Sequence, residues 1–526
     1  MKRSVNCVLL IKSMKMKKLL LLIGIALSLT INAQVPAIEW QKVLGGTGSE
    51  GYGIIILQTT DGGYIIAGNT NSNDGDVLGN HGGYDAWVVK LSTTGIIQWQ
   101  KAIGGTSYDS ISSIVQTTDG GFVLAGRTSS VDGDLIGFAS DQFFNHRAWV
   151  LKLSVTGNIQ WQETLVGNPE QSTFVTHIQQ TSDGGFIFTG KKVFWNPQGS
   201  FLFSVCWVVK LTPTSGIQWE KIFGGVGTGE SYEPGNIQQT TDGGYIFAGY
   251  RSYIITTNDA WIVKLSNTGD TQWQKIIGGS GDDGANSIQQ TSDGGYIYAG
   301  NTNSNDGDVM GNYGSYDGWL VKLSDIGNIQ WQKTIGGTGY DVANSFQQTA
   351  DGGYIVTGIT YSNDNDVTGN HGLSDFWVVK LSTAGIIQWQ KCLGGSNEDE
   401  AYSIQKTSDS GYVVAGVSLS NDNDVTGNHG DGDFWVVKLS PDQLSTVEFS
   451  NTSLILYPNP THSLLNIQTS NSVVLDKIII TDLTGKTVIE QTQNTNQVSV
   501  EKLATGVYIL NGYSEGNKFQ EKFIKQ

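Results

Sequence analysis

Two series of tryptophans recur in step along most of this chain, and each series has seven members. In the first series, a glutamine or glutamate lies on either side of the tryptophan, and neighbouring members are 54–62 residues apart. The second series opens short apolar stretches that end in Lys-Leu. A repeat of this length, with several short strands in each unit, indicates an architecture that closes on itself. The first series is Trp40, Trp99, Trp161, Trp219, Trp273, Trp331 and Trp389. The second series is Trp87, Trp149, Trp207, Trp261, Trp319, Trp377 and Trp435.

Each repeat contains four expected strands, and in the fifth unit they cover residues 287–291, 296–300, 319–323 and 328–335. Asp-Gly and Gly-Gly steps between the first two strands provide the positive φ angles that tight hairpins need. A longer polar loop separates the second strand from the third, and no segment has a helical period. Four antiparallel strands repeated radially form one blade of a β-propeller.

The chain enters the repeat region with a lone fourth strand, Ile38 to Leu44, and leaves it after a third strand, Phe434 to Leu439. We therefore predict an all-β fold in which residues 38–440 form a seven-bladed propeller and the N-terminal strand completes the last blade. Such closure removes open sheet edges. The repeated Lys-Leu-Ser-x-x-Gly-x-Ile-Gln-Trp resembles the tryptophan-docking pattern of quinoprotein-type propellers. This resemblance implies a packing role for the tryptophans and no quinone cofactor.

The charge is uneven along the chain. The net charge is −17, residues 1–33 carry six basic and no acidic side chains, and residues 453–526 are balanced. The acidity therefore lies in the repeats, and such a surface repels nucleic acid. Lysines before the apolar run Leu19 to Ile31, with Ala33 at its exit, are typical of a signal peptide at 1–33. Residues 1–13 are then expected to be a mis-assigned start, and the mature chain has no stretch long enough for a transmembrane segment.

The long loops carry a repeated Asn-Asp-Gly/Asn-Asp-Val-x-Gly-Asn pattern. Two interpretations stay open for its carboxylates. They hold loop turns through side-chain hydrogen bonds to the backbone, or they bind Ca²⁺, which prefers several oxygen ligands. No other cofactor is required by the sequence. The pattern supplies Asp74 and Asp76, Asp306 and Asp308, Asp364 and Asp366, and Asp422 and Asp424.

The second and third units break this pattern and carry aromatic residues instead. Aromatic side chains beside polar loops suit stacking on a glycan or anchoring of a surface protein. The alternative is that they pack on one another where the acidic turns are missing. The candidate binding residues are Phe138, Phe143, Phe144, Phe194, Trp195, Phe201 and Phe203.

No catalytic motif is evident: the chain has neither a His-Glu-x-x-His zinc motif nor a phosphate-binding Gly-x-x-x-x-Gly-Lys loop. The sequence therefore favours a non-catalytic binding or adhesion module for glycan or protein, with no catalytic residues assigned. A polysaccharide-active enzyme, a glycoside hydrolase or lyase, is the second hypothesis. A calcium-stabilised structural spacer is the third.

The pattern stops after residue 440, a polar linker is expected at 441–452, and a smaller strand-rich domain at 453–526. Its motifs include Leu465-Asn466-Ile467 and a strand that begins at Leu503. The residues that carry the resemblance are Tyr457, Pro458, Asn459, Pro460, Asp482, Gly485, Lys486, Gly506 and Tyr508. Together they resemble the type A C-terminal sorting domain of the type IX secretion system. The resemblance implies an immunoglobulin-like β-sandwich, a Bacteroidetes-type bacterium, type IX secretion machinery as partner, and a secreted or outer-membrane-surface location.

Overall fold

The structure is a computed structural model that describes part of the chain. It describes residues 35–526 except for 136–145, 166–170, 196–200, 225–229, 254–256, 443–453, 470–473, 483–485 and 515–516. The chain divides into two compact units between residues 443 and 444. The expected signal peptide at 1–33 and most of the expected linker lie outside the described residues.

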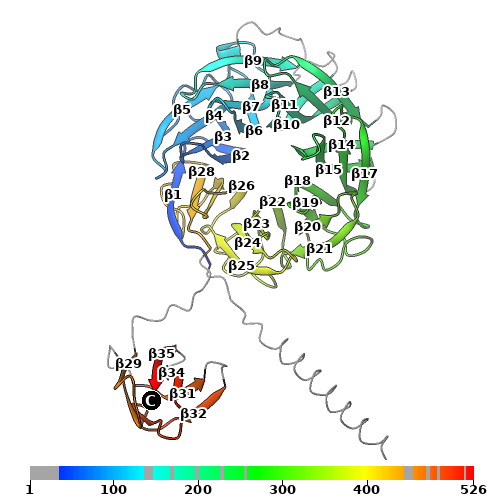
Figure 1. The fold of residues 1–526 in the computed structure, drawn as a ribbon. Helices are drawn as coiled ribbons and strands as arrows, with labels where there is room; N and C mark the ends of the chain where they lie inside the picture. Colours follow the sequence, from blue (N-terminus) through cyan, green and yellow to red (C-terminus); the bar gives the residue numbers. More distant parts are fainter. Residues whose placement is uncertain are drawn as a thin grey trace, which may run out of the picture. The chain divides into compact units, whose positions relative to one another are not determined.

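The first unit consists of seven four-stranded sheets arranged as blades around a central opening (Figure 1). Within each blade the strands are antiparallel and follow the chain outward from the centre. Blade 1 contains β2 (Glu50–Gln58), β3 (Tyr64–Thr70), β4 (Asp85–Leu91) and β5 (Ile97–Ile103). Blade 2 contains β6 (Asp109–Gln116), β7 (Phe122–Thr128), β8 (Arg147–Leu153) and β9 (Ile159–Leu165), with the short 3-10 helix η1 (Gly133–Leu135) after β7. Blade 3 contains β10 (Gln171–Gln180), β11 (Phe186–Trp195), β12 (Phe201–Leu211) and β13 (Ile217–Phe223).

The remaining blades repeat this order, except that the last one combines both ends of the unit. Blade 4 contains β14 (Glu230–Gln239), β15 (Tyr245–Tyr253), β16 (Asn258–Leu265) and β17 (Thr271–Ile277). Blade 5 contains β18 (Asp283–Gln290), β19 (Tyr296–Thr302), β20 (Asp317–Leu323) and β21 (Ile329–Ile335). Blade 6 contains β22 (Asp341–Gln348), β23 (Tyr354–Thr360), β24 (Asp375–Leu381) and β25 (Ile387–Leu393). Blade 7 contains β26 (Asp399–Lys406), β27 (Tyr412–Ser418), β28 (Asp433–Leu439) and β1 (Ile38–Leu44).

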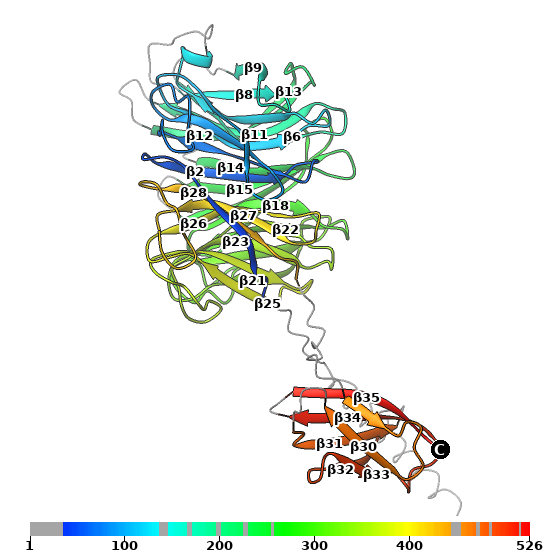
Figure 2. The ribbon, with the colours of Figure 1, turned by 90° about the vertical axis from the view of Figure 1, so that its left-hand side faces the viewer.

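The ring is closed by β1, which pairs antiparallel with β28 and places Val43 opposite Trp435. In Figure 2, which views the ring from the side, β1 is the dark blue strand that lies along β28. The predicted seven-bladed propeller with an N-terminal closing strand is therefore confirmed.

Both tryptophan series pack between blades. Trp87, on the third strand of blade 1, is fully buried, and its ring centroid lies 4.9 Å from that of Phe434 in blade 7. Its Nε1 donates a 2.9 Å hydrogen bond to Gln100, which explains why a glutamine follows the fourth-strand tryptophan. On a fourth strand, Trp40 contacts Tyr64 of the next blade with ring centroids 5.5 Å apart. Tryptophans in both series thus fill the wedge between neighbouring sheets.

A buried lysine on each third strand pairs with the aspartate of the hairpin between the first two strands. Lys152 lies 2.7 Å from Asp119. Hydrogen bonds from Lys152 and then from Thr117 lower the pKa of Asp119 to about 2. All seven blades have this ion pair, with N–O distances between 2.7 and 3.0 Å. The pair explains why each blade repeats both Lys-Leu and the Asp of its first hairpin.

The second unit is a sandwich of two antiparallel sheets. One sheet contains β29 (Leu454–Tyr457), β30 (Leu464–Thr469) and β33 (Gln497–Ser499). The other contains β31 (Lys477–Asp482), β32 (Thr487–Gln491), β34 (Gly506–Ser514) and β35 (Asn517–Lys525). Leu465 and Ile467 of the first sheet and Ile478 and Leu510 of the second share one buried core. The Tyr508 hydroxyl donates to the Ala504 carbonyl at 3.0 Å, a contact of the kind found at the tyrosine corner of immunoglobulin-like sandwiches.

Candidate functional site

The two long connections of each blade lie on one face of the propeller, which we call the long-loop face. Asp364, in the loop between β23 and β24, accepts hydrogen bonds from the amide (2.8 Å) and hydroxyl (2.7 Å) of Thr338. Thr338 belongs to the connection that enters blade 6. Asp74 makes the same two contacts with Thr47, and Asp132 makes them with Thr106. These contacts place both connections on one face.

The acidic loop residues act on the backbone of the preceding connection. Asp306 and Asp422 accept amide hydrogen bonds from Ser280 and Ser396 at 2.7 and 2.8 Å. The backbone amides of the second aspartates, Asp76, Asp308, Asp366 and Asp424, donate to a glycine carbonyl of that connection at 2.8–3.1 Å. In the described part of the chain, no group of three or more His, Cys, Asp or Glu side chains is placed to hold a metal ion. The hydrogen bonds support the interpretation of this pattern as turns.

Five of the seven blade junctions contain a pair of carboxyl groups that face one glycine, and all of these residues are buried except Asp259, which is partly buried. A methyl group placed on the glycine would come within 2.0–2.9 Å of an oxygen from each carboxyl group. At the junction of blades 1 and 2, Asp85 Oδ1 points toward this glycine and makes no hydrogen bond with any described residue. Burial raises the pKa of Asp85 and Asp375 to about 6 and that of Asp317 to about 7. The pairs are Glu50–Asp433, Asp85–Asp109, Asp259–Asp283, Asp317–Asp341 and Asp375–Asp399.

Three histidines at equivalent loop positions support this arrangement. His81 donates its backbone amide to Asp85 Oδ2 at 3.1 Å, and its ring Nδ1 lies 2.7 Å from the same oxygen. His371 and His429 repeat the contacts with Asp375 and Asp433. These histidines therefore hold the buried carboxyl groups.

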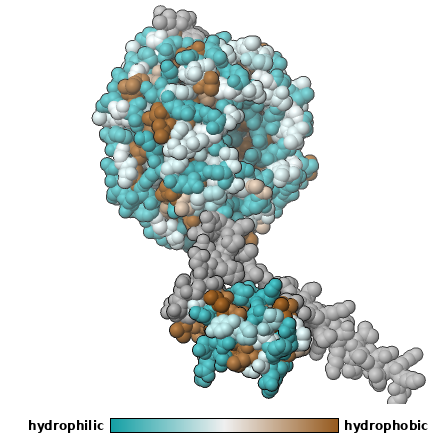
Figure 3. All heavy atoms as spheres, turned by 60° about the vertical axis from the view of Figure 1, so that its left-hand side comes forward, coloured by the Kyte–Doolittle hydropathy of each residue, from teal (hydrophilic) through white to brown (hydrophobic). Residues whose placement is uncertain are grey.

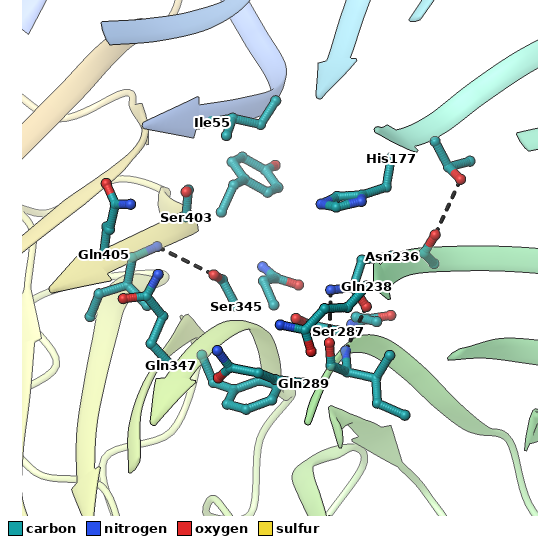
Figure 4. A pocket seen from close by; sticks show the side chains of 18 of the residues that line it. Ile55, His177, Asn236, Gln238, Ser287, Gln289, Ser345, Gln347, Ser403 and Gln405 are labelled. Carbon is teal, nitrogen blue, oxygen red and sulfur yellow. Dashed lines mark hydrogen bonds between the residues drawn. The ribbon is translucent and has the colours of Figure 1, made fainter. Parts of the chain in front are cut away.

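The first strands of all seven blades line a central channel with a volume of about 400 Å³. Side-chain amides and hydroxyls project into it from different blades, as Figure 4 shows for Gln238, Gln347 and Ser403. Among the described residues that line the channel there is no Asp, Glu, Lys or Arg. His177 is the one histidine of this lining, and desolvation in the channel lowers its pKa to about 4. The channel wall is therefore polar but uncharged near neutral pH.

Glutamines bridge the blades around the channel. The Gln238 side-chain oxygen accepts the Gln290 amide of the next blade at 2.6 Å, and Gln347 accepts the Lys406 amide at 2.8 Å. Five blades contribute such a glutamine, but Leu57 and Val115 take its place in blades 1 and 2. The five bridging glutamines are Gln179, Gln238, Gln289, Gln347 and Gln405. This ring of bridges is therefore interrupted at the junctions of blades 1–2 and 2–3.

A pocket of about 200 Å³ lies at these same junctions, on the long-loop side, and we call it the blade 1–3 pocket. Arg127 on β7 extends between two aromatic rings, 4.7 Å from the centroid of Tyr108 and 5.0 Å from that of Phe174. Lys191 on β11 lies 5.4 Å from the Phe174 ring. His146 continues the aromatic wall, with its ring centroid 5.3 Å from that of Phe174. The pocket therefore combines aromatic rings with positive charge.

A second small pocket, of about 240 Å³, lies between blades 7 and 1. It is lined by Glu398, Glu400 and Asp431 together with Tyr402. The Tyr402 hydroxyl donates to Glu400. This pocket is negative, whereas the blade 1–3 pocket is positive.

The aromatic residues proposed from the sequence have different positions in the structure. Phe138, Phe143 and Phe144 lie outside the described residues. Phe194 and Phe203 stack on each other, with centroids 4.5 Å apart, in the long β11–β12 hairpin of blade 3. Trp195 at the end of β11 donates from Nε1 to Ser172 at 3.3 Å. Phe201 pairs with Trp195 in the strand register, and its side chain is not described.

The blade 1–3 pocket lies in the same blades as these aromatic residues, but none of those that the structure describes lines it. Arg127 and Lys191 occupy one equivalent position, directly after the Ala-Gly or Thr-Gly of the second strand. The other five blades have no charged residue there. Their residues are Asn69, Tyr250, Asn301, Ile359 and Val417. Aligning the seven repeats at this position would have revealed the two cations.

The described residues of the sorting motif stabilise the ends of the sandwich. Asn459 accepts the Ile524 amide at 2.9 Å and donates to the Lys522 carbonyl at 3.0 Å, so the Tyr457–Pro460 turn is attached to the last strand. Lys486 donates its amide to Asp482 Oδ1 at 3.1 Å. Gly506 begins β34, and Gly485 lies outside the described residues.

Residues 455–526 match the family model of the secretion system C-terminal sorting domain. This match confirms the resemblance to the type IX sorting domain and indicates export to a secreted or cell-surface location. No curated protein matches the chain. Among the described residues we find no helix with the length and hydropathy that a membrane crossing requires.

Several solved structures are distantly similar to the chain. Sqt1 from Chaetomium thermophilum is 11% identical, with 77% of this chain and 100% of that chain covered and a TM-score of 0.39. PorZ, a surface component of the type IX secretion system of Porphyromonas gingivalis, is 10% identical, with 93% of this chain and 75% of that chain covered and a TM-score of 0.25. A PL25 ulvan lyase is 10% identical, with 66% of this chain and 79% of that chain covered and a TM-score of 0.37.

Proposed function

We propose that the protein is a non-catalytic glycan-binding module that acts outside the cell after export by the type IX machinery. The observation that carries the proposal is the blade 1–3 pocket. Aromatic rings and polar side chains converge there, at the place where the repeating pattern of the channel wall is broken. Glycans are commonly bound by aromatic faces together with a few polar groups that fix orientation.

The pocket has both kinds of group. Tyr108 and Phe174 are half-buried, so part of each ring is accessible to a ligand. Asn69, Ser112 and Thr176 also line the pocket and provide amide and hydroxyl groups. These side chains can exchange hydrogen bonds with sugar hydroxyls.

The β11–β12 hairpin extends this surface outward. Trp195 lies four residues beyond Lys191 on β11, which corresponds to roughly 13 Å along a strand. We propose that Phe194 and Trp195 form an outer rim that contacts a longer glycan chain, while Phe203 is buried and supports Phe194 by stacking on it. The long-loop face would then bind an extended polymer.

A panel of soluble polysaccharides and oligosaccharides, with binding measured on the purified protein, tests the proposal. Phe174→Ala is expected to weaken binding at least about tenfold, because aromatic contacts are worth about 1–3 kcal/mol in comparable sites. Tyr313→Ala is the matched control, since Tyr313 is an exposed aromatic residue on a blade 5 loop. Failure of the protein to bind any glycan, or equal losses in both variants, would refute the proposal.

The pocket between blades 7 and 1 favours a second candidate function, a polysaccharide-active enzyme. Glycoside hydrolysis commonly needs two carboxyl groups near the scissile bond, and Glu398 and Glu400 line one pocket. Under this hypothesis, incubation with the same panel would release reducing ends, and Glu400→Gln would abolish the release. Binding without release would favour the non-catalytic function.

A further inference from the structure

We propose that the ligand of the blade 1–3 pocket is an acidic glycan, and that Arg127 binds its carboxylate or sulfate group. This inference rests on the proposed function, because it names the class of glycan that the same pocket would take.

Arg127 differs from neighbouring basic residues in its charge pairing. Arg251 forms an ion pair with Glu230, Lys191 lies 2.7 Å from Glu233, and each third-strand lysine has its hairpin aspartate. Arg127 has no ion pair with any Asp or Glu of the described residues. Its one hydrogen bond to a side chain runs from Nε to Ser110 Oγ at 3.3 Å. In a chain of net charge −17, a half-buried arginine without an acidic partner is available to a ligand.

Two aromatic rings hold the guanidinium of Arg127 in place. The ring centroids of Tyr108 and Phe174 lie 4.7 and 5.0 Å from the guanidinium carbon. The resulting cation–π contacts position the group without neutralising its charge. The planar guanidinium can then donate two parallel hydrogen bonds to a carboxylate or sulfate. The site therefore suits an anion with paired oxygens.

His146 packs against Phe174 beside the pocket. Burial, and next the charge of Arg127, lower the pKa of His146 to about 4. The His146 ring nitrogen Nδ1 also lies 2.7 Å from the Ser129 hydroxyl. His146 is therefore neutral above about pH 5, and the positive charge available to an anion comes from Arg127, since Lys191 is paired.

The lining favours an acidic sugar over an acidic peptide. Asn69 accepts the Ile111 amide at 3.1 Å through its oxygen, which leaves its amide group facing the pocket residues as a donor. Hydroxyl and amide groups around one cation match a ligand that has several hydroxyls beside one acidic group. The volume of about 200 Å³ is below the 300–1,000 Å³ typical of drug-sized ligands, so it suits one sugar unit of a chain.

Binding of charge-matched glycans to the full-length secreted protein tests the inference. The ligands are oligosaccharides of hexuronic acid, sulfated oligosaccharides, neutral oligosaccharides of equal length, and poly-glutamate as an acidic peptide. We expect the acidic sugars to bind at least about tenfold more tightly than the neutral ones. Comparing the hexuronic acid ligands with the sulfated ligands shows whether the site prefers a carboxylate or a sulfate group.

Two substitutions link the preference to Arg127. Arg127→Gln keeps a polar side chain of similar length and is expected to remove the preference for acidic sugars, whereas Arg127→Lys retains part of it. Lys101→Gln is the control, because it removes the same charge from an exposed position on the outer strand β5. Thermal melting of each variant verifies that it is folded.

The outcomes separate the inference from the proposed function. If neutral glycans bind as tightly as acidic ones and Arg127→Gln changes nothing, the inference is wrong and the glycan-binding function stands. If no glycan binds, both are wrong. Equal losses in Arg127→Gln and Lys101→Gln, or equally tight binding of poly-glutamate, would also overturn the inference.

Discussion

Asp317 and Asp341 face each other from neighbouring blades across Gly336, where a methyl group would lie 2.6 and 2.9 Å from their nearest oxygens. Asp341 accepts hydrogen bonds from the Gly337 amide and the Ser362 hydroxyl, both at 2.7 Å, and from Thr360. Asp317 accepts the Tyr313 amide at 2.9 Å through Oδ2, while its Oδ1 makes no hydrogen bond with any described residue. A proton on Asp317 Oδ1 would relieve the repulsion between the two buried groups.

This pair predicts that stability falls as the pH rises from about 4 to about 7. Burial raises the pKa of Asp317 to about 7, from an ordinary value of 3.8. A group whose pKa is higher in the folded state stabilises the fold fully below its unfolded pKa, and this contribution is lost as the pH rises through about 7. We expect Asp317→Asn to reduce the loss of stability between pH 5 and pH 8 by about 1–3 kcal/mol. Chemical denaturation at pH 5 and at pH 8 measures the free energy of unfolding of each variant.

Asp325→Asn is the matched control, because Asp325 lies exposed in the turn after β20 of the same blade. It removes one negative charge without touching the buried pair. If Asp317→Asn and Asp325→Asn had the same effect at pH 8, general charge repulsion would explain the result and the buried pair would not.

The closing strand predicts a long-range effect on blade 7. A shortened chain that begins at Gly45 lacks β1 and leaves the backbone of β28 unpaired on one side. It also removes Gln41, which accepts the Trp435 indole hydrogen bond at 2.7 Å. We expect a lower melting temperature and faster hydrogen exchange in β28, with β20 of blade 5 less affected. An unchanged melting temperature would contradict the closure of the ring by β1.

The acidic loops predict a stability effect that does not depend on calcium. Asp364→Ala removes two hydrogen bonds to Thr338, which we expect to cost about 1–2 kcal/mol of unfolding free energy. Because these hydrogen bonds already hold Asp364 in the turn, calcium added to chelator-treated protein is expected to leave the melting temperature unchanged. A rise in melting temperature, with heat on calorimetric titration, would instead support a calcium site in these loops.

The sorting domain predicts where a truncated protein is found. A chain that ends at Ser440 keeps the propeller but lacks the domain, so we expect it to remain inside the bacterium. Fractionation with antibodies against the propeller measures its location. Tyr508→Phe is a milder variant, because it removes only the hydrogen bond to Ala504 and should still be exported. Detection of the truncated chain outside the cell would show that the sorting domain is not needed for export.

Much of the fold could be predicted from the sequence, because its repeats record local geometry. Trp87 and Trp435 occupy equivalent positions on third strands, and the Asp-Gly steps mark hairpins whose backbone needs positive φ. The strand count at the two ends then required Ile38–Leu44 to complete the last blade. The motifs of the tail identified its family, and the family match confirms it.

The candidate site depended on contacts between blades. Tyr108 lies just before β6, Arg127 is on β7 and Phe174 is on β10, and only the angle at which blades 2 and 3 pack brings all three together. The pairing of Asp317 with Asp341 likewise depends on two sheets meeting at one glycine. Side-chain alternation within a strand is a local property that the sequence determines by itself. Which side chains meet across a junction is decided by how neighbouring sheets twist and pack in the closed ring.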